Sequence, residues 1–158
     1  LPRGLPLPYL NDSKKVTPRR REILFDQIRE QAVAYAIAWA DEKEIDEINI
    51  LNARMLAMDR AIKLLEPAAD FALIDGNRNK GIELQNEMVV HGDARSASIA
   101  AASILAKVSR DRFMVELAEQ YPQYAFEKHK GYPTKLHYER LRQYGPSPVH
   151  RKTFLKKL

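Results

Sequence analysis

Two aspartates stand directly after short apolar runs in the middle of the chain. Asp75 ends the run "FALID", and Asp93 follows the run "EMVV" after a His-Gly pair. Carboxylate oxygens suit Mg²⁺ and Mn²⁺, which keep coordination positions open for water and phosphate. Each residue also has a purely structural interpretation, because Asp75 begins an Asp-Gly turn pair and Asp93 is placed to cap the helix that follows. Taken alone, neither aspartate decides between a metal site and these local roles.

The remaining sequence predicts an α/β fold in which short strands deliver the two carboxylates. Thr17 and Pro18 predict the start of a helix, because a hydroxyl caps the first turn and proline already holds a helical φ. Alanine alternates with larger side chains over 34–40, which favours a strand. Apolar residues three or four apart over 51–65 indicate an amphipathic helix, whose methionines we assign to the core. The predicted elements are, in order, a helix over 17–33, a strand over 34–40, a helix that ends before Pro67, strands at 71–75 and 87–90, and helices over 93–120 and 134–144.

The composition excludes several classes of site. The chain has 158 residues, the length of one ordinary domain, and it contains no cysteine. Disulfides, zinc-thiolate sites and cysteine nucleophiles are therefore excluded, and any metal must be bound by oxygen or imidazole ligands. No apolar run approaches the roughly 20 residues of a membrane span, and the first ten residues lack the features of a signal peptide. We expect a soluble cytoplasmic protein without a membrane partner.

Positive charge is concentrated at both ends of the chain. The net charge is +5, yet 1–21 hold six Lys or Arg against one acid, 128–158 hold nine against one, and the residues between them hold eleven against nineteen. Such blocks are either solvated faces or contacts for a phosphate backbone on both sides of an acidic metal site. The distribution of charge alone leaves both interpretations open.

Five motifs then occur in a specific order along the chain: "LNDSKK", "EIDEINILNARMLAMDRAI", "LIDGN", "GDARSASIAAASILAKVSRDR" and "HKGYPT". In these motifs the chain resembles bacterial ribonuclease HII over nearly its whole length. The resemblance implies a ribonuclease H-like mixed sheet flanked by helices. It also implies a monomeric endonuclease that uses Mg²⁺ or Mn²⁺. Such an enzyme cuts the RNA strand of RNA/DNA hybrids and cuts beside ribonucleotides embedded in duplex DNA, leaving 3′-hydroxyl and 5′-phosphate ends.

The resemblance also implies which residues bind the metal. In the family four carboxylates hold the metal ions, and the two late ones match Asp75 and Asp93. The two early ones lie in an Asp-Glu-Ala-Gly-Arg-Gly motif, which this sequence does not contain. We therefore expect residues 1–158 to form a single ribonuclease HII-like domain that is N-terminally incomplete and lacks the family's first two, central strands. The alternative is a catalytically inactive nucleic-acid-binding fragment or remnant of such an enzyme.

Further positions match family contacts to nucleic acid. Ser13 and Lys14 of "NDSKK" match residues near the nucleic-acid backbone, and Tyr132 of "HKGYPT" matches a tyrosine near the sugar at the RNA-DNA junction. Their structural alternatives are a solvated loop for the first two and a half-buried loop aromatic for Tyr132. Additional candidates for phosphate contact are Lys107, Arg110 and Lys130. His150 and Arg151 match a family His-Arg pair without a derivable role, and none of the four histidines has the spacing of a metal-ligand pair.

Overall fold

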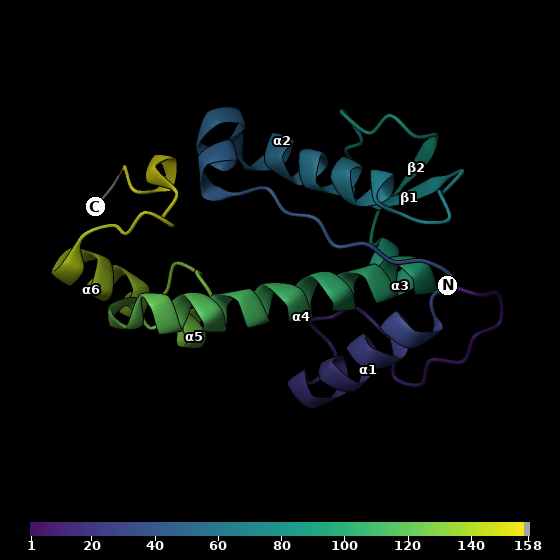
Figure 1. Cartoon of the computed structure of the whole chain (residues 1–158), viewed down its shortest axis with the longest axis horizontal. Coiled ribbons are helices and arrows are strands. Elements are labelled where there is room, and N and C mark those ends of the chain that lie inside the picture. Colours follow the sequence, from purple (N-terminus) through teal and green to yellow (C-terminus); the bar gives the residue numbers. More distant parts are fainter. Residues whose placement is uncertain (157–158) are drawn as a thin grey trace.

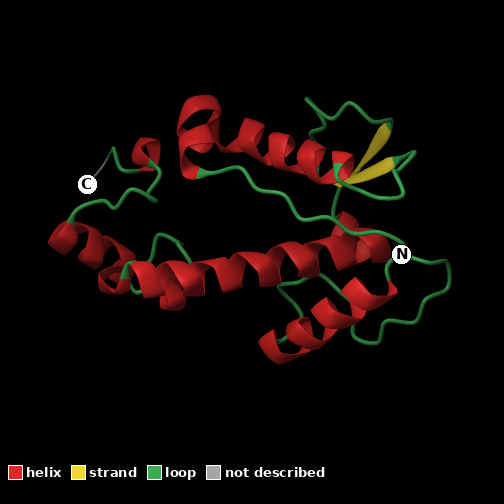
Figure 2. Ribbon diagram, viewed as in Figure 1, coloured by secondary structure: helices red, strands yellow, loops and turns green. Residues whose placement is uncertain are grey.

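The computed structural model describes residues 1–156, which form a mostly helical α/β fold (Figures 1 and 2). The elements are, in order, α1 (Pro18–Gln31), α2 (Glu42–Lys63), β1 (Ala72–Asp75), β2 (Asn86–Val89), α3 (Gly92–Arg95), α4 (Ala97–Gln120), the 3₁₀ turn η1 (Pro122–Tyr124), α5 (Phe126–His129), α6 (Lys135–Tyr144) and the 3₁₀ turn η2 (Lys152–Phe154). The predicted α/β class is confirmed. Within residues 1–156, no helix combines the length and the apolar character that crossing a membrane requires.

The long helix α4 connects two hydrophobic clusters. Its first half packs against α1, and the buried side chains there include Leu24, Ile28 and Ile104. Its second half packs with η1, α5 and α6 around Met114 and Phe126. Figure 1 shows α1 and α2 on opposite sides of α4 in this view, with α6 at its C-terminal end. The two ends of α4 are therefore fixed by different parts of the chain.

The helix starts follow local capping chemistry. The Thr17 hydroxyl accepts a hydrogen bond of 3.4 Å from the backbone N–H of Arg20, and Pro18 opens α1 as expected. In α2, Asp41 and Glu44 form a reciprocal capping box, which satisfies backbone N–H groups that the first turn leaves free. This box starts α2 about two turns before the predicted apolar stripe, and Asn49, at φ 69°, interrupts the helix between the two.

The helix that was expected to run continuously from 93 to 120 is divided in two. Ser96 has an extended backbone, and its hydroxyl accepts a hydrogen bond of 3.4 Å from the N–H of Ile99, so that it caps α4. The short helix α3 precedes this break and contains Asp93. A serine at an N-cap competes well against helix continuation, which explains the interruption.

The sheet of the described residues consists of β1 and β2, which are parallel. Their register pairs Ala72 with Asn86 and Asp75 with Val89. Parallel strands end at the same edge of a sheet, so the segments that follow Asp75 and Val89 begin side by side. This edge holds the candidate metal ligands.

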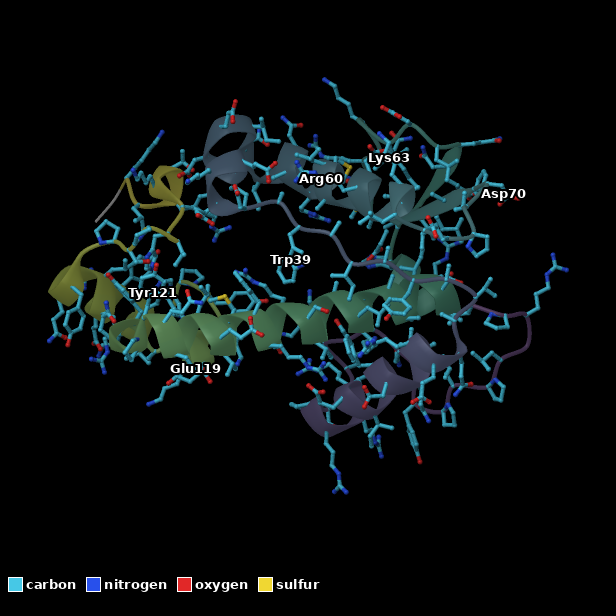
Figure 3. All side chains as sticks on the ribbon, viewed as in Figure 1. Trp39, Arg60, Lys63, Asp70, Glu119 and Tyr121 are labelled. Carbon is cyan, nitrogen blue, oxygen red and sulfur yellow. The ribbon has the colours of Figure 1, made fainter. Side chains whose placement is uncertain are left out.

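The predicted strand over 34–40 is wrong. In the structure this segment is a loop that runs between α2 and α4 (Figures 1 and 3). The Trp39 carbonyl accepts a hydrogen bond of 2.9 Å from Arg60 of α2, and the Trp39 ring packs at 5.1 Å from the Phe113 ring of α4. Alternating side chains form a strand only when another strand supplies a hydrogen-bonding partner. Within residues 1–156 this segment lies in no ladder.

Candidate active site

The structure joins the two segments that carry the candidate metal ligands. Asp75 ends β1, and its Oδ1 accepts a hydrogen bond of 2.9 Å from the backbone N–H of Gly92, the residue that precedes Asp93. The backbone N–H of Gly76 also donates to the Val89 carbonyl at 3.0 Å, which extends the parallel ladder past the end of the strand. Both aspartates are half-buried. The carboxylates therefore come from neighbouring backbone segments at one edge of the sheet.

Gly92 permits this close approach. A Cβ at this position would lie 2.6 Å from Cδ1 of Ile99, 3.3 Å from Oδ1 of Asp75 and 3.4 Å from Cγ2 of Ile99. His91, immediately before it, has a left-handed backbone with φ 54°, which turns the chain from β2 into α3. The sequence analysis did not identify Gly92 as a site residue, although its place between His91 and Asp93 was visible.

The local alternatives for the two aspartates do not describe their positions. Asp93 lies within the first turn of α3, and the capping position belongs to His91, which makes no capping hydrogen bond through its side chain. The carboxylate of Asp75 bonds to Gly92, 17 residues away, and not to the turn that follows it. Asp75 thus connects β1 to α3, and Asp93 lies in the first turn of α3.

Two carboxylates fit part of a site for a hard divalent cation. One oxygen of Asp75 is engaged by Gly92, and the other carboxylate oxygens supply the donor type that Mg²⁺ and Mn²⁺ prefer. Across residues 1–156, no group of three or more His, Asp or Glu residues is arranged to hold a metal ion. The pair agrees with the two late carboxylates that the resemblance implies.

The two residues of the "NDSKK" motif have different environments. Ser13 is buried, and its carbonyl accepts a hydrogen bond of 2.9 Å from Arg21. Lys14 is exposed, and its backbone N–H donates to Asp12 at 2.9 Å. This turn presents the ammonium of Lys14 to solvent and leaves the Ser13 side chain largely covered. Contact of either residue with nucleic acid stays a prediction.

Lys107, Arg110 and Tyr132 lie where α4 meets the loop after α5, and Lys130 is the half-buried residue that caps the end of α5. The Tyr132 ring is 61% exposed, and the ammonium of Lys107 lies 5.9 Å from its centre. Lys107 also pairs with Asp111 at 2.8 Å. Arg110 is exposed overall, yet desolvation of its guanidinium lowers its pKa. Its Nη2 would lie 3.3 Å from a Cβ on Gly131, so these side chains form one partly basic surface.

Three histidines adjoin this surface in a buried row that the sequence analysis missed. His129, His137 and His150 are all buried, the first two rings stack with centres 4.0 Å apart, and Nε2 of His137 lies 3.0 Å from Nε2 of His150. Their separations in the sequence follow no helical or metal-ligand period, so the pattern carried no signal. The ordered "SPVH" stretch, in which Ser147 bonds to the His150 ring, was the available clue.

The C-terminal segment is tied to α2 through Asp46. Its carboxylate accepts hydrogen bonds from the backbone N–H groups of Lys152 at 2.8 Å and Thr153 at 3.0 Å, and from the Thr153 hydroxyl at 2.6 Å. The bond from the Thr153 hydroxyl is the largest cause of the lowered pKa of Asp46. Figure 1 shows this segment beside the start of α2. Asp46 thereby fixes the chain directly after His150 and Arg151.

Comparison with known proteins identifies the family and a similar fold. A family model described as Ribonuclease HII matches residues 5–157. The ribonuclease HII of Endomicrobium trichonymphae is 56% identical over 155 residues, which cover 98% of this chain and 74% of that protein. The ribonuclease HII of Marinomonas sp. (strain MWYL1) is 55% identical over 150 residues, which cover 94% and 75%. Among solved structures, the ribonuclease H2 of Pyrococcus horikoshii OT3 is similar, with a TM-score of 0.75 and 26% identity over 92% of this chain and 76% of that one.

Proposed function

This chain belongs to the ribonuclease HII family, and from that premise we propose that its protein is an endonuclease for ribonucleotides paired with or embedded in DNA. It hydrolyses the RNA strand of RNA/DNA hybrids and cuts beside single ribonucleotides in duplex DNA, leaving 3′-hydroxyl and 5′-phosphate ends. We further propose that it acts as a monomer in the cytoplasm. The observation that carries the proposal is the bond between Asp75 and the residue before Asp93.

Asp75 and Asp93 would hold the Mg²⁺ or Mn²⁺ ions that the family implies. When bound, such ions activate water and stabilise the charge on the leaving oxygen of a phosphodiester. The contribution of this chain is to keep two carboxylates on neighbouring rigid elements, which fixes their separation before any ligand arrives. Their negative charge also requires cations at this edge before a phosphate approaches closely.

The basic and aromatic side chains farther along α4 would position the nucleic acid. Lys107 lies about 15 Å from Ala97 along the helix axis, since each residue adds about 1.5 Å. Lys107, Arg110 and Lys130 would bind phosphates, which orients a duplex without reading its sequence. The exposed Tyr132 ring would pack against a ribose, a flat contact that suits an aromatic side chain. Lys14 would add a phosphate contact from the N-terminal loop.

Cleavage of defined duplexes tests the proposal. The complete protein is incubated with a DNA duplex that contains one ribonucleotide, with an RNA/DNA hybrid, and with an all-DNA duplex, in Mg²⁺ or Mn²⁺. We expect cuts in the first two substrates only, loss of cleavage with EDTA, and products whose masses show 3′-hydroxyl and 5′-phosphate ends. Equal cleavage of the all-DNA duplex would contradict the proposed substrate class.

A second function has one observation in its favour. Within the described part of the chain, no third carboxylate or histidine joins Asp75 and Asp93 in a metal-binding group. A catalytically inactive protein that binds nucleic acid through its basic residues would have this arrangement. Duplex binding without any cleavage by the complete protein, in either metal, would favour this second function.

A further inference from the structure

Two buried imidazoles form hydrogen bonds with the backbone of the Tyr132 loop. The N–H of Gly131 donates to Nδ1 of His129 at 3.1 Å, and the carbonyl of Tyr132 lies 3.0 Å from Nδ1 of His137. The His129 and His137 rings stack with an angle of 12° between their planes. The loop that carries the exposed Tyr132 ring therefore bonds through its backbone to a pair of stacked, buried histidines.

The hydrogen bonds of this row define the protonation of each ring. A backbone N–H can only donate, so Nδ1 of His150 accepts from Ser147 at 3.0 Å and the proton of a neutral His150 is on Nε2. A carbonyl can only accept, so Nδ1 of His137 carries its proton and Nε2 is free to accept from His150. By the same reasoning His129 accepts at Nδ1 and donates through Nε2 to the Tyr124 carbonyl at 2.7 Å.

The surroundings of His137 and His150 keep these two rings neutral. Desolvation is the largest cause that lowers the pKa of His150, to about 4, and of His137. The positive charge of Arg151, which follows His150 in the sequence, lowers the pKa of both rings further. Burial lowers the pKa of the Arg151 guanidinium itself, and the charge of Asp46 opposes that shift. A second proton on His150 would convert Nδ1 from an acceptor into a donor, so the Ser147 N–H would lose its partner and only the Ser147 hydroxyl, 2.7 Å from Nδ1, could accept.

We propose that His137 and His150 are positioning residues, which fix the Tyr132 loop through a directed row of hydrogen bonds from Ser147 through His150 and His137 to the Tyr132 carbonyl. The row is complete at both ends, because it begins at a backbone donor and ends at a backbone acceptor. It sets the direction in which the Tyr132 ring projects from the surface. The consequence for catalysis rests on the function proposed above, in which Tyr132 packs against a ribose.

Nitrogen NMR of the histidine rings tests the row without any substrate. In the ¹⁵N-labelled complete protein near neutral pH, we expect a proton on Nδ1 of His137 and on Nε2 of His129 and His150. Each signal is assigned by its loss in a single variant. A neutral His137 with its proton on Nε2 would overturn the proposal, and so would a doubly protonated His137 or His150. Both outcomes hold whether or not the protein is a nuclease.

Variants test the effect of the row on the loop. His137→Phe keeps an aromatic ring and removes the bond to the Tyr132 carbonyl. The Tyr132 N–H still bonds to the His129 carbonyl, but the loop should open more readily. We therefore expect amide exchange at Tyr132 to accelerate by about tenfold, as for the loss of one hydrogen bond. His150→Gln retains an acceptor and a donor and should stay within about twofold of the parent, whereas His150→Phe should accelerate exchange. Tyr138→Phe on the same helix α6 is the matched control. Unchanged exchange in a folded His137→Phe variant would overturn the proposal.

A double-mutant cycle then separates positioning from general destabilisation. We expect His137→Phe to lower kcat for a duplex with one embedded ribonucleotide, and to have no further effect in the Tyr132→Ala background, because it acts through Tyr132. Equal losses in both backgrounds would overturn the positioning role. If the parent protein cleaves none of its substrates, the proposed function fails, and the tautomers and amide exchange still decide on the row.

Discussion

Asp75 accepts a hydrogen bond of 2.9 Å from the backbone N–H of Gly92, which directly connects the end of β1 to the start of α3. This bond explains how two aspartates 18 positions apart in the sequence reach one edge of the sheet. The parallel register brings Val89 beside Asp75, His91 turns the chain, and Gly92 leaves room for the carboxylate. Each step depends on backbone geometry, so the position of the two side chains is fixed by rigid elements.

Replacing either aspartate by asparagine should abolish most cleavage and spare the fold. In Asp75→Asn the amide oxygen would still accept the Gly92 hydrogen bond, but the negative charge that binds the metal would be lost. Metal stabilisation of the transition state is worth several kcal/mol, so we expect kcat to fall about a thousandfold. Activity and thermal unfolding of Asp75→Asn and Asp93→Asn in the complete protein measure both effects. Asp70→Asn, at the exposed Asp70 before β1 (Figure 3), is the control. Near-normal cleavage by Asp75→Asn would rule out this assignment.

Gly92→Ala should weaken the site through its backbone. The added Cβ would meet Ile99 at 2.6 Å, so the buried Ile99 side chain or α3 must shift. Overpacking of this kind costs about 1 to 3 kcal/mol of unfolding free energy. We also expect a higher metal concentration for half-maximal cleavage, because the bond to Asp75 lengthens. Unchanged stability and metal dependence in Gly92→Ala would show that the space between Gly92 and the Ile99 and Asp75 side chains can accommodate a methyl group.

Local signals in the sequence predicted α1 and α6 well, but missed the early start of α2, the break between α3 and α4, and α5. Thr17 and Pro18 start α1 within one residue of expectation, and α6 matches the predicted helix except at its first residue. These features depend on hydrogen bonds between residues three or four apart, which the sequence places together. The two strands before Asp75 and Asp93 were also found from their short apolar runs. Their expected burial was wrong for β2, whose residues are half-buried or exposed.

Features that depend on distant residues were not predictable. The alternation over 34–40 indicates that side chains point in alternate directions. A strand also needs a second strand as its hydrogen-bonding partner, and no local pattern reveals whether one is adjacent. The histidine row brings together His129, His137 and His150 from α5, α6 and the C-terminal segment. Packing around Phe126 and Tyr124, and the bonds from Asp46 to the C-terminal segment, place these rings in contact. The metal-binding role predicted for Asp93 came from the resemblance to the family and not from spacing.

Binding to duplexes should depend steeply on salt. Each Lys or Arg that neutralises a phosphate releases counterions, which gives a slope of about −0.9 in log K against log salt for B-DNA. We expect Lys14→Ala and Lys130→Ala each to weaken binding. Each should also reduce the magnitude of the slope by about 0.9, the value for one phosphate contact. Titrations at several salt concentrations measure this, and Lys43→Ala, on the exposed acidic start of α2, is the control. Affinity that does not change with salt would mean that the basic residues are only solvated.

Removal of the Tyr132 ring should affect cleavage more than binding. The ring is 61% exposed and makes no hydrogen bond through its hydroxyl among the described contacts, so Tyr132→Ala should leave the fold intact. Phosphate contacts supply most of the duplex affinity, whereas a ribose contact acts at one nucleotide. We expect kcat for a single embedded ribonucleotide to fall while the Kd for the duplex changes by less than about threefold. Equal losses in both measurements would instead assign Tyr132 to general binding.

The stability of the complete protein should fall on acidification in two separate ranges of pH. The folded pKa of His150 is about 4, below its ordinary value of 6.5. The folded state therefore favours the neutral ring, and its contribution is complete above pH 6.5 and is lost as the pH falls towards 4.

The pKa of Glu44 is lowered to about 2, mainly by the hydrogen bond from Arg60, so its contribution is lost only below about pH 4.5. Urea unfolding at intervals from pH 7 to 4 should show a decrease of at most about 1.4 kcal/mol per pH unit for this histidine. His150→Gln should make the curve less steep between pH 6.5 and 4.5, where the lowered pKa of His137 still contributes, whereas Glu44→Gln should leave that range unchanged. The same slope in the parent and in His150→Gln would contradict a neutral, buried His150.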